Sequence, residues 1–223
     1  LFHINDRTDR EFEWHYHDFH KIIVFVSGKV TYHIEGKAYQ LKPQDILLVS
    51  QGAIHKPEID PSIPYERYIF WIRDDLSSPE LNTCFQKAND RSFNLIRLDS
   101  ALQEKLKDLL PEIEHSLRDT QFGDSILSKA LFAQFMVYIN RIFLKSSTAP
   151  DQKSYSSDSQ VEQLLKYINR NLSENLSIDH LAERFFFSKY HMMRKFKKET
   201  GYTIHNYIIS KRLLHARSLI AQG

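Results

Sequence analysis

The fold is decided by residues 176–201, which read LSIDHLAERFFFSKYHMMRKFKKETG. Two serines in this stretch, Ser177 and Ser188, suit the N-cap of a helix. Each is flanked by two apolar residues that can pack together across the first turn of the helix as a hydrophobic staple. These pairs are Leu176 with Leu181, and Phe187 with Met192. Gly201 suits the left-handed position after a helix. The stretch therefore predicts two short helices joined by a tight turn, which is the geometry of a helix-turn-helix.

The second of these helices has two unlike faces. At 100° per residue, Met192 and Phe196 fall together and can enter a core. The opposite face offers arginine for guanine, tyrosine and methionine for base edges, and lysine for phosphates. A Lys- and Arg-rich surface helix is often only solvated, but the two caps and the short turn favour duplex DNA as a partner. The predicted DNA-binding residues are Lys189, Tyr190, His191, Met193, Arg194, Lys197 and Lys198.

These residues resemble the first helix-turn-helix of AraC/XylS-type regulators, with a match over 176–183 and 188–201. The resemblance continues into the helix that connects two such units in this family, at Ile204, Tyr207, Ile208, Arg212, Leu213, Ala216 and Leu219. On that pattern, Tyr190, Met193 and Arg194 stand where the family contacts bases. The resemblance implies a ligand-responsive, DNA-binding transcription regulator of bacterial carbohydrate or small-metabolite genes.

Two departures from the family pattern change what we expect. Lys195 stands where the family usually has an apolar residue, so the core side of this helix is expected to pack less tightly there. The chain stops at Gly223, where the family continues into a second helix-turn-helix, so we expect a DNA-binding domain truncated after its first unit. One unit supplies half of the phosphate and base contacts, and weak DNA binding should follow.

Residues 11–74 predict a compact antiparallel barrel, because short β-branched and aromatic runs alternate with turns such as Ser27-Gly28-Lys29 and Glu35-Gly36-Lys37. The run WHYHDFHK over 14–21, together with Gly28, Pro43-Gln44-Asp45 and His55, resembles the two motifs of cupin barrels. Cupin barrels are also the usual sensor domain of AraC-type proteins. The resemblance thus implies a ligand sensor at the N-terminal end of the chain.

Metal-binding cupins place three histidines and a glutamate around an ion. His15, His17 and His55 fill the histidine places here, but Lys21 stands at the glutamate position, where an ammonium repels a divalent cation and supplies no ligand. We therefore expect no metal, no cofactor and no catalytic residue. Two alternatives stay open: the histidines are only packed within the barrel, or the chain is a metal-dependent cupin enzyme of the dioxygenase or isomerase type.

The preferred interpretation of the barrel is a pocket for a small polar effector. Aromatic faces beside hydrogen-bonding groups suit a sugar, and an ammonium suits a carboxylate; the sequence does not choose between these two classes. The predicted ligand-binding residues are His15, His17, Lys21, Tyr32, His55 and Trp71.

Two amphipathic helices are predicted over 102–117 and 126–143, where apolar residues recur at helical spacing. The second, with Ile126, Phe135 and Val137, is apolar around much of its circumference, so it either faces the second subunit of a homodimer or only packs in the core. Residues 146–160 are polar and aperiodic, as in a flexible linker. We expect an α+β chain, with a cupin-like sensing and dimerisation domain over 1–145, a linker over 146–160 and a separate all-α helix-turn-helix domain over 161–223.

Composition narrows the setting. No apolar run approaches the roughly 18 residues of a membrane span, the first residues lack a signal-peptide pattern, and Cys84 is the only cysteine, so we expect a cytoplasmic protein with no membrane partner. From Gln160 onward eleven Lys and Arg stand against five Asp and Glu, compared with 19 against 23 before it. This basic segment favours nucleic acid, although solvated lysines alone would give the same count.

Overall fold

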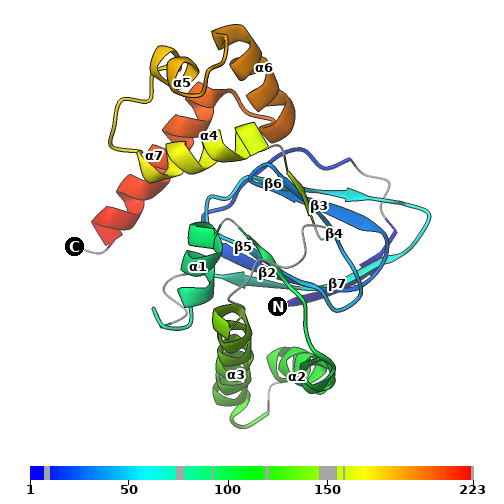
Figure 1. Ribbon diagram of the computed structural model, residues 1–223. Coiled ribbons are helices and arrows are strands. Elements are labelled where there is room, and N and C mark those ends of the chain that lie inside the picture. The colour runs from blue at the N-terminus through cyan, green and yellow to red at the C-terminus, as the bar shows by residue number, and fades with distance from the viewer. Residues whose placement is uncertain are drawn as a thin grey trace.

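The computed structural model describes residues 1–7, 11–73, 78–91, 93–118, 121–145, 155–157 and 159–221. Two antiparallel sheets form the N-terminal barrel (Figure 1). One sheet has the order β1-β7-β2-β5-β8, from strands β1 (Phe2–Asp6), β7 (Tyr65–Ile72), β2 (His20–Ser27), β5 (Ile46–Val49) and β8 (Leu95–Ile96). The other has the order β6-β3-β4-β9, from β6 (His55–Ile59), β3 (Val30–Ile34), β4 (Lys37–Gln40) and β9 (Tyr155–Ser157).

The barrel interior is filled by side chains that alternate along the strands. Val30, Tyr32 and Ile34 of β3 are buried and Thr31 and His33 are partly exposed, as their spacing predicts. Strand β2 is buried on both faces, because one face enters the barrel and the other meets the helices below it. The expected barrel, followed by helices and a C-terminal helix-turn-helix, is confirmed.

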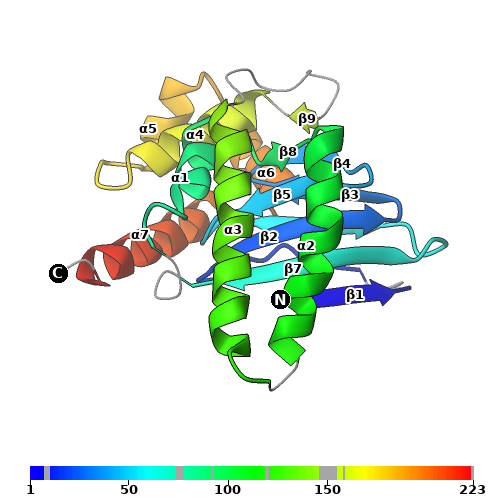
Figure 2. The same cartoon turned by 90° about the horizontal axis from the view of Figure 1, so that it is seen from below.

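Three helices cover the outer face of the larger sheet: α1 (Thr83–Arg91), α2 (Ser100–Arg118) and α3 (Asp124–Lys145). Figure 2 shows α2 and α3 side by side across the strands. The predicted helices over 102–117 and 126–143 correspond to α2 and α3, whereas α1 was not predicted. By length and composition α3 could also cross a membrane, but its buried residues, among them Met136 and Ile139, pack into the core of this domain.

The packing of α3 shows which of its apolar residues meet the barrel. Phe135 is fully buried and stacks on Phe70 of β7 with ring centroids 4.5 Å apart, so it belongs to the core. Several large apolar residues that face outward lie at or before the N-terminal end of α3. Ile126 is 75% exposed and Leu127 is 43% exposed, and the preceding Phe122 is fully exposed.

The C-terminal domain consists of α4 (Ser159–Arg170), α5 (Ile178–Arg184), α6 (Lys189–Thr200) and α7 (Ile204–Ala221). Both predicted N-caps are confirmed: Ser177 accepts a hydrogen bond from the backbone N–H of His180, and Ser188 accepts one from that of His191. Gly201 ends α6 with φ of 76°, the left-handed conformation that glycine adopts without strain. Buried Leu181, Met192 and Phe196 join the four helices in one core.

Part of the expected linker belongs to the barrel. Residues 155–157 form β9 and pair with β4, and α4 already begins at Ser159. The remaining linker residues, 146–154 and 158, lie outside the described residues. A polar segment can extend a sheet in this way because strand pairing uses backbone groups, which satisfy an otherwise open edge whatever the side chains are.

The two domains pack against each other through a buried polar network. Glu35, in the turn between β3 and β4, accepts hydrogen bonds from the backbone N–H of Ile54 at 2.8 Å and from the hydroxyl of Tyr207 at 2.5 Å. It also pairs with the ammonium of Lys211 at 2.9 Å. A second pair joins Lys37 of β4, only 5% exposed, to Glu162 of α4 at 3.1 Å. These contacts hold the helix-turn-helix domain on one end of the barrel (Figure 1).

Candidate functional site

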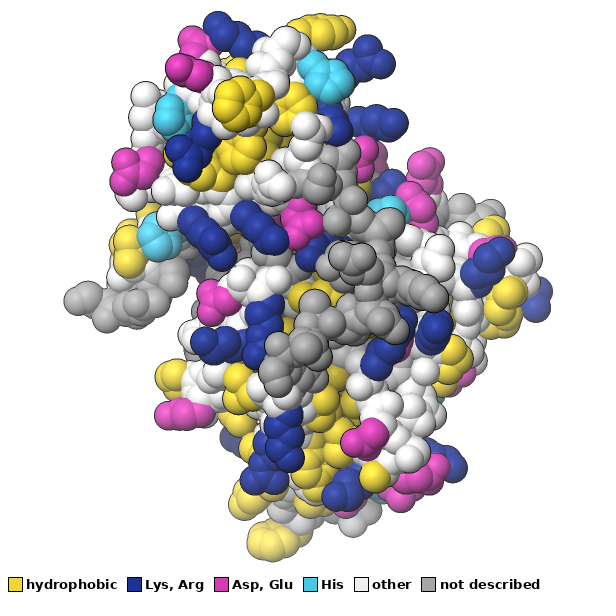
Figure 3. Space-filling model, in the orientation of Figure 1, with side chains coloured by type: hydrophobic (Ala, Val, Ile, Leu, Met, Phe, Trp, Pro, Cys, Tyr) yellow, Lys and Arg dark blue, Asp and Glu magenta, His cyan; other side chains and the backbone are white. Residues whose placement is uncertain are grey.

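The outer face of α6 carries all of the predicted DNA-binding side chains. Each is exposed, and Tyr190 and Met193 are 72% and 41% exposed although both are large and apolar in part. Lys189 forms an ion pair with Asp179 of α5. Figure 3 shows Lys and Arg side chains around this end of the molecule. The predicted division of α6 into a buried and an exposed face is confirmed, because Met192 and Phe196 are buried on the opposite side. Contact with DNA itself remains a prediction.

Lys195, which departs from the family pattern, makes a polar contact with α4. It is partly buried, and its ammonium donates to the side-chain oxygen of Gln160 in α4 at 3.1 Å. The lysine therefore replaces an apolar contact between α6 and α4 with a polar one, and its stem can still cover the core beneath it.

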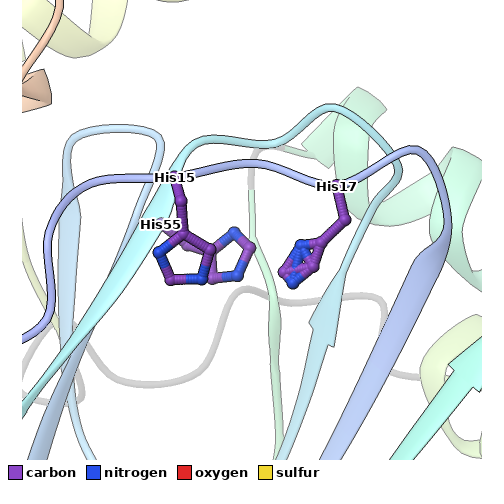
Figure 4. A group of neighbouring side chains, drawn as sticks. All are labelled: His15, His17 and His55. Atoms are coloured by element: carbon purple, nitrogen blue, oxygen red, sulfur yellow. The ribbon is translucent and has the colours of Figure 1, made fainter.

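Three of the predicted ligand-binding residues meet at the mouth of the barrel. His15 and His17 come from the segment over residues 14–18, which crosses this mouth, and His55 comes from the start of β6 (Figure 4). His15 and His55 exchange backbone hydrogen bonds, of 3.2 and 2.9 Å, which fix their alignment. The ring centroids of His15 and His55 are 4.4 Å apart, and those of His17 and His55 are 4.5 Å apart.

The surroundings keep two of these imidazoles neutral. Burial, assisted by the nearby Lys21 ammonium, lowers the pKa of His55 to about 2 and that of His17 to about 4. Burial also lowers the pKa of Lys21 to about 8, with a further contribution from Arg67. Near pH 7 the cluster thus combines neutral ring nitrogens with one lysine that is still mainly charged.

The other predicted ligand-binding residues are placed around this cluster. Tyr32 is buried below it, with its ring 5.9 Å from that of His55, and its hydroxyl lies 3.4 Å from the ammonium of Lys21. Trp71 lies opposite Lys21 in the pairing of β2 with β7, so it shares the inner face of the sheet. It is nevertheless 52% exposed and stacks near Phe19, which places it at the rim of the barrel rather than inside it.

The segment over residues 14–18 faces both domains, because its side chains alternate. The histidines turn into the barrel, and the residues between them turn toward the helix-turn-helix domain. The backbone oxygen of Trp14 accepts from the hydroxyl of Tyr202 at 3.4 Å, and Asp18 accepts from Arg217 of α7 at 2.7 Å. Sequence reasoning named the histidines but missed these contacts, since nothing in the local pattern indicates a partner about 190 residues away.

One described hollow lies elsewhere, between the barrel and the C-terminal helices. It has a volume of about 710 Å³ and is lined by side chains that include Gln51, Asn82, Lys166 and Lys211. None of the three clustered histidines lines it. An organic molecule held between two of the histidine rings would need two contacts of about 3.5–4 Å, hence centroids roughly 7–8 Å apart, which is wider than the cluster.

Comparison with known proteins places both halves of the chain. Residues 1–136 match the model of the AraC-like ligand binding domain, and residues 168–208 match that of bacterial regulatory helix-turn-helix proteins of the AraC family. The chain is 22% identical to the transcriptional activator RhaR of Mannheimia succiniciproducens, covering 94% of this chain and 73% of that protein. It is 24% identical to the uncharacterized regulator YbfI of Bacillus subtilis, covering 96% and 75%.

Among solved structures, the AraC-like transcriptional activator CuxR aligns over 90% of this chain and 68% of its own, with 17% identity and a TM-score of 0.42. The first model covers the barrel strands up to β8 with α1, α2 and part of α3, and the second runs from the end of α4 to the start of α7 and contains both capped helices. Since the ligand-binding model alone spans more than half of the sequence, the chain belongs to the AraC family of bacterial regulatory helix-turn-helix proteins.

Proposed function

We propose that this ligand-responsive transcription regulator reads DNA with the outer face of α6 and senses a small polar effector at the mouth of the barrel. The observation that carries the proposal is the exposed face of α6, which presents seven side chains suited to bases and phosphates. This face follows the tight turn between α5 and α6, two helices that each begin at a serine N-cap. Such a helix fits the major groove with its N-terminal half against base edges. The proposed setting is the bacterial cytoplasm, and no catalytic step is assigned.

Arg194→Ala tests this face. We expect it to weaken binding to the specific operator by about 1–3 kcal/mol and to leave the fold intact, because Arg194 is exposed and can contact a guanine in two places. Operator binding is measured by fluorescence anisotropy, with sites selected from random duplexes, and folding by circular dichroism.

Lys197→Ala is the matched control, one helical turn further along α6. We expect it to weaken binding to all duplexes alike and to flatten the salt dependence, since a phosphate contact carries no sequence information. If Arg194→Ala binds the selected site as tightly as the parent does, α6 does not read bases through this side chain.

The groups at the barrel mouth favour two classes of effector. Lys21 offers a cation to a carboxylate, and Trp71 and Phe19 offer aromatic faces to a sugar. A carbohydrate or a related small acid is therefore the effector we propose to screen, by thermal shift on the full chain, because a ligand stabilises the folded state that binds it. An effector there would touch the segment over residues 14–18, which also contacts Tyr202 and Arg217 of the DNA-binding domain.

A homodimer is proposed through α2 and α3. Figure 3 shows apolar side chains gathered over these two helices, and Phe122 and Ile126 are exposed without being needed by the core. Two joined copies would hold two DNA-binding units at high effective concentration. We expect the chain to sediment as a dimer at micromolar concentration and Ile126→Asp to sediment as a monomer, because a buried unpaired charge opposes association. Lys129→Asp, exposed on the same helix, is the control for charge alone. A monomeric parent chain would remove this interface.

A further inference from the structure

The histidine cluster has the composition and arrangement of a metal site. His15, His17 and His55 each offer one ring nitrogen, and these nitrogens all lie within 4.8 Å of one another. Figure 4 shows the three rings turned toward the same point, with two carried by the segment over residues 14–18 and one by the first residue of β6. Imidazole nitrogens are ligands that divalent transition metals such as zinc prefer.

Backbone carbonyls orient two of the rings for coordination. The Nδ1 atoms of His15 and His55 lie 2.8 Å from the carbonyl oxygens of Glu13 and Ala53. A carbonyl only accepts, so each Nδ1 carries a proton, and Nε2 is the ring nitrogen left to bind a metal. Metal-binding histidines are held in this way, because the donated hydrogen bond fixes both the tautomer and the angle of the ring.

The structure leaves one of these lone pairs without a partner. The Nε2 atom of His55 is buried and makes no hydrogen bond among the described residues. Leaving such an acceptor unsatisfied is costly, and native proteins rarely tolerate it without water, a ligand or an ion. The ring that carries this atom lies beside both other histidines, with centroids 4.4 Å from His15 and 4.5 Å from His17.

The size of the space also favours an ion. Three nitrogens around zinc at about 2.0–2.1 Å in tetrahedral geometry lie about 3.4 Å from each other. The widest separation in the cluster would therefore have to close by roughly 1.4 Å, which small side-chain rotations of His15 and His17 can supply. An organic molecule would instead need the rings to part by several ångströms.

We propose that His15, His17 and His55 bind one divalent transition-metal ion through their Nε2 atoms, with a fourth position open to water or to an oxygen of the effector. This reverses the expectation drawn from Lys21. The missing carboxylate and the nearby ammonium should weaken binding relative to a four-ligand site without abolishing it, because three ring nitrogens remain and two of their rings are oriented by backbone carbonyls. Exchangeable binding of this kind suits a sensor, and that regulatory consequence alone rests on the proposed function.

The test is titration of the purified full chain, first stripped with a chelator, with Co²⁺ as the probe. We expect one equivalent to produce the visible absorption of tetrahedral or five-coordinate cobalt, and Zn²⁺ to displace it. His17→Ala should weaken binding by at least about 100-fold, since even an outer-shell change costs about 10–100-fold. His17 is partly exposed and makes no side-chain hydrogen bond among the described contacts, so this variant should keep the fold better than a change at buried His55.

Two further variants sharpen the test. His33→Gln changes a partly exposed barrel histidine that pairs with Glu58, and it should leave the cobalt spectrum unchanged. Lys21→Met removes the ammonium and should tighten binding by about tenfold or more. No cobalt spectrum at one equivalent, or equal loss in His17→Ala and His33→Gln, overturns the proposal. Operator binding by the metal-free chain is measured in parallel, so failure of the metal site is distinguished from failure of the proposed regulator.

Discussion

Glu35→Ala is expected to lower the free energy of unfolding by about 2–4 kcal/mol and to let the helix-turn-helix domain unfold separately from the barrel. Glu35 is the acceptor shared by Tyr207, which is fully buried, and Lys211, whose side chain is 14% exposed. Its removal leaves the hydroxyl with Asn169 and the ammonium with the backbone oxygen of Gly52. Most of the lost free energy of unfolding comes from Lys211, because its partly desolvated ammonium loses the carboxylate that balances its charge.

Two matched variants apportion the effect. Glu35→Gln keeps an oxygen for Tyr207 but no charge for Lys211, so we expect a smaller loss than in Glu35→Ala. Glu112→Ala changes an exposed glutamate of α2 and should leave stability within about 0.5 kcal/mol. Thermal unfolding followed by tryptophan fluorescence and circular dichroism gives the two domains separate signals. If Glu35→Ala melts in one transition like Glu112→Ala, this network does not hold the domains together.

The helix-turn-helix could be predicted from the sequence because its determinants are local. Ser177, Ser188 and Gly201 each fix a helix end through contacts within four residues, and the apolar spacing fixes which faces are buried. The same reasoning found α2 and α3. It left open whether Phe135 meets the barrel or a second subunit, because helical spacing shows that a residue is apolar but not which neighbour covers it.

The contact between the domains could not be predicted. Glu35-Gly36 was identified only as a turn, and its carboxylate meets Tyr207 and Lys211 more than 170 residues further along the chain. The residues 155–157 were assigned to a linker for a similar reason, since their place in the sheet depends on the open edge of β4. Polar pairs of this kind are set by the assembled fold, and single-sequence patterns carry no signal for them.

The members of the proposed histidine site were named from the sequence, whereas the metal chemistry proposed for them rests on the structure. His15, His17 and His55 were found by their spacing, and Lys21 argued against a metal. What that spacing could not show is the backbone: the carbonyls of Glu13 and Ala53 hold the rings, and the orphaned nitrogen of His55 becomes visible only once burial is known. The orientation of the histidine rings depends on the backbone around the sequence motif as much as on the spacing of the histidines within it.

Gly201→Ala has the second large expected effect, a loss of about 2–5 kcal/mol in the free energy of unfolding. Two causes act together. A residue with a Cβ pays about 1–2 kcal/mol in the left-handed conformation that ends α6. The added Cβ would also overlap the indole and the Cβ of Trp14, which are not the far end of a flexible side chain, and overpacking of this kind costs about 1–3 kcal/mol.

A double-mutant cycle separates these two causes and tests where the segment over residues 14–18 lies. In a Trp14→Ala background the overlap is gone, so Gly201→Ala should cost only the conformational part, and the coupling between the two sites should be about 1–3 kcal/mol. Unfolding in urea, followed by circular dichroism, measures all four chains of the cycle. Equal costs of Gly201→Ala with and without Trp14 would mean that the indole is not seated on the end of α6. The Trp14 indole would then make no contact with the end of α6. The effect of a ligand bound at the histidines would have to be transmitted to the DNA-binding domain by other contacts of the segment, such as the one between Asp18 and Arg217 of α7.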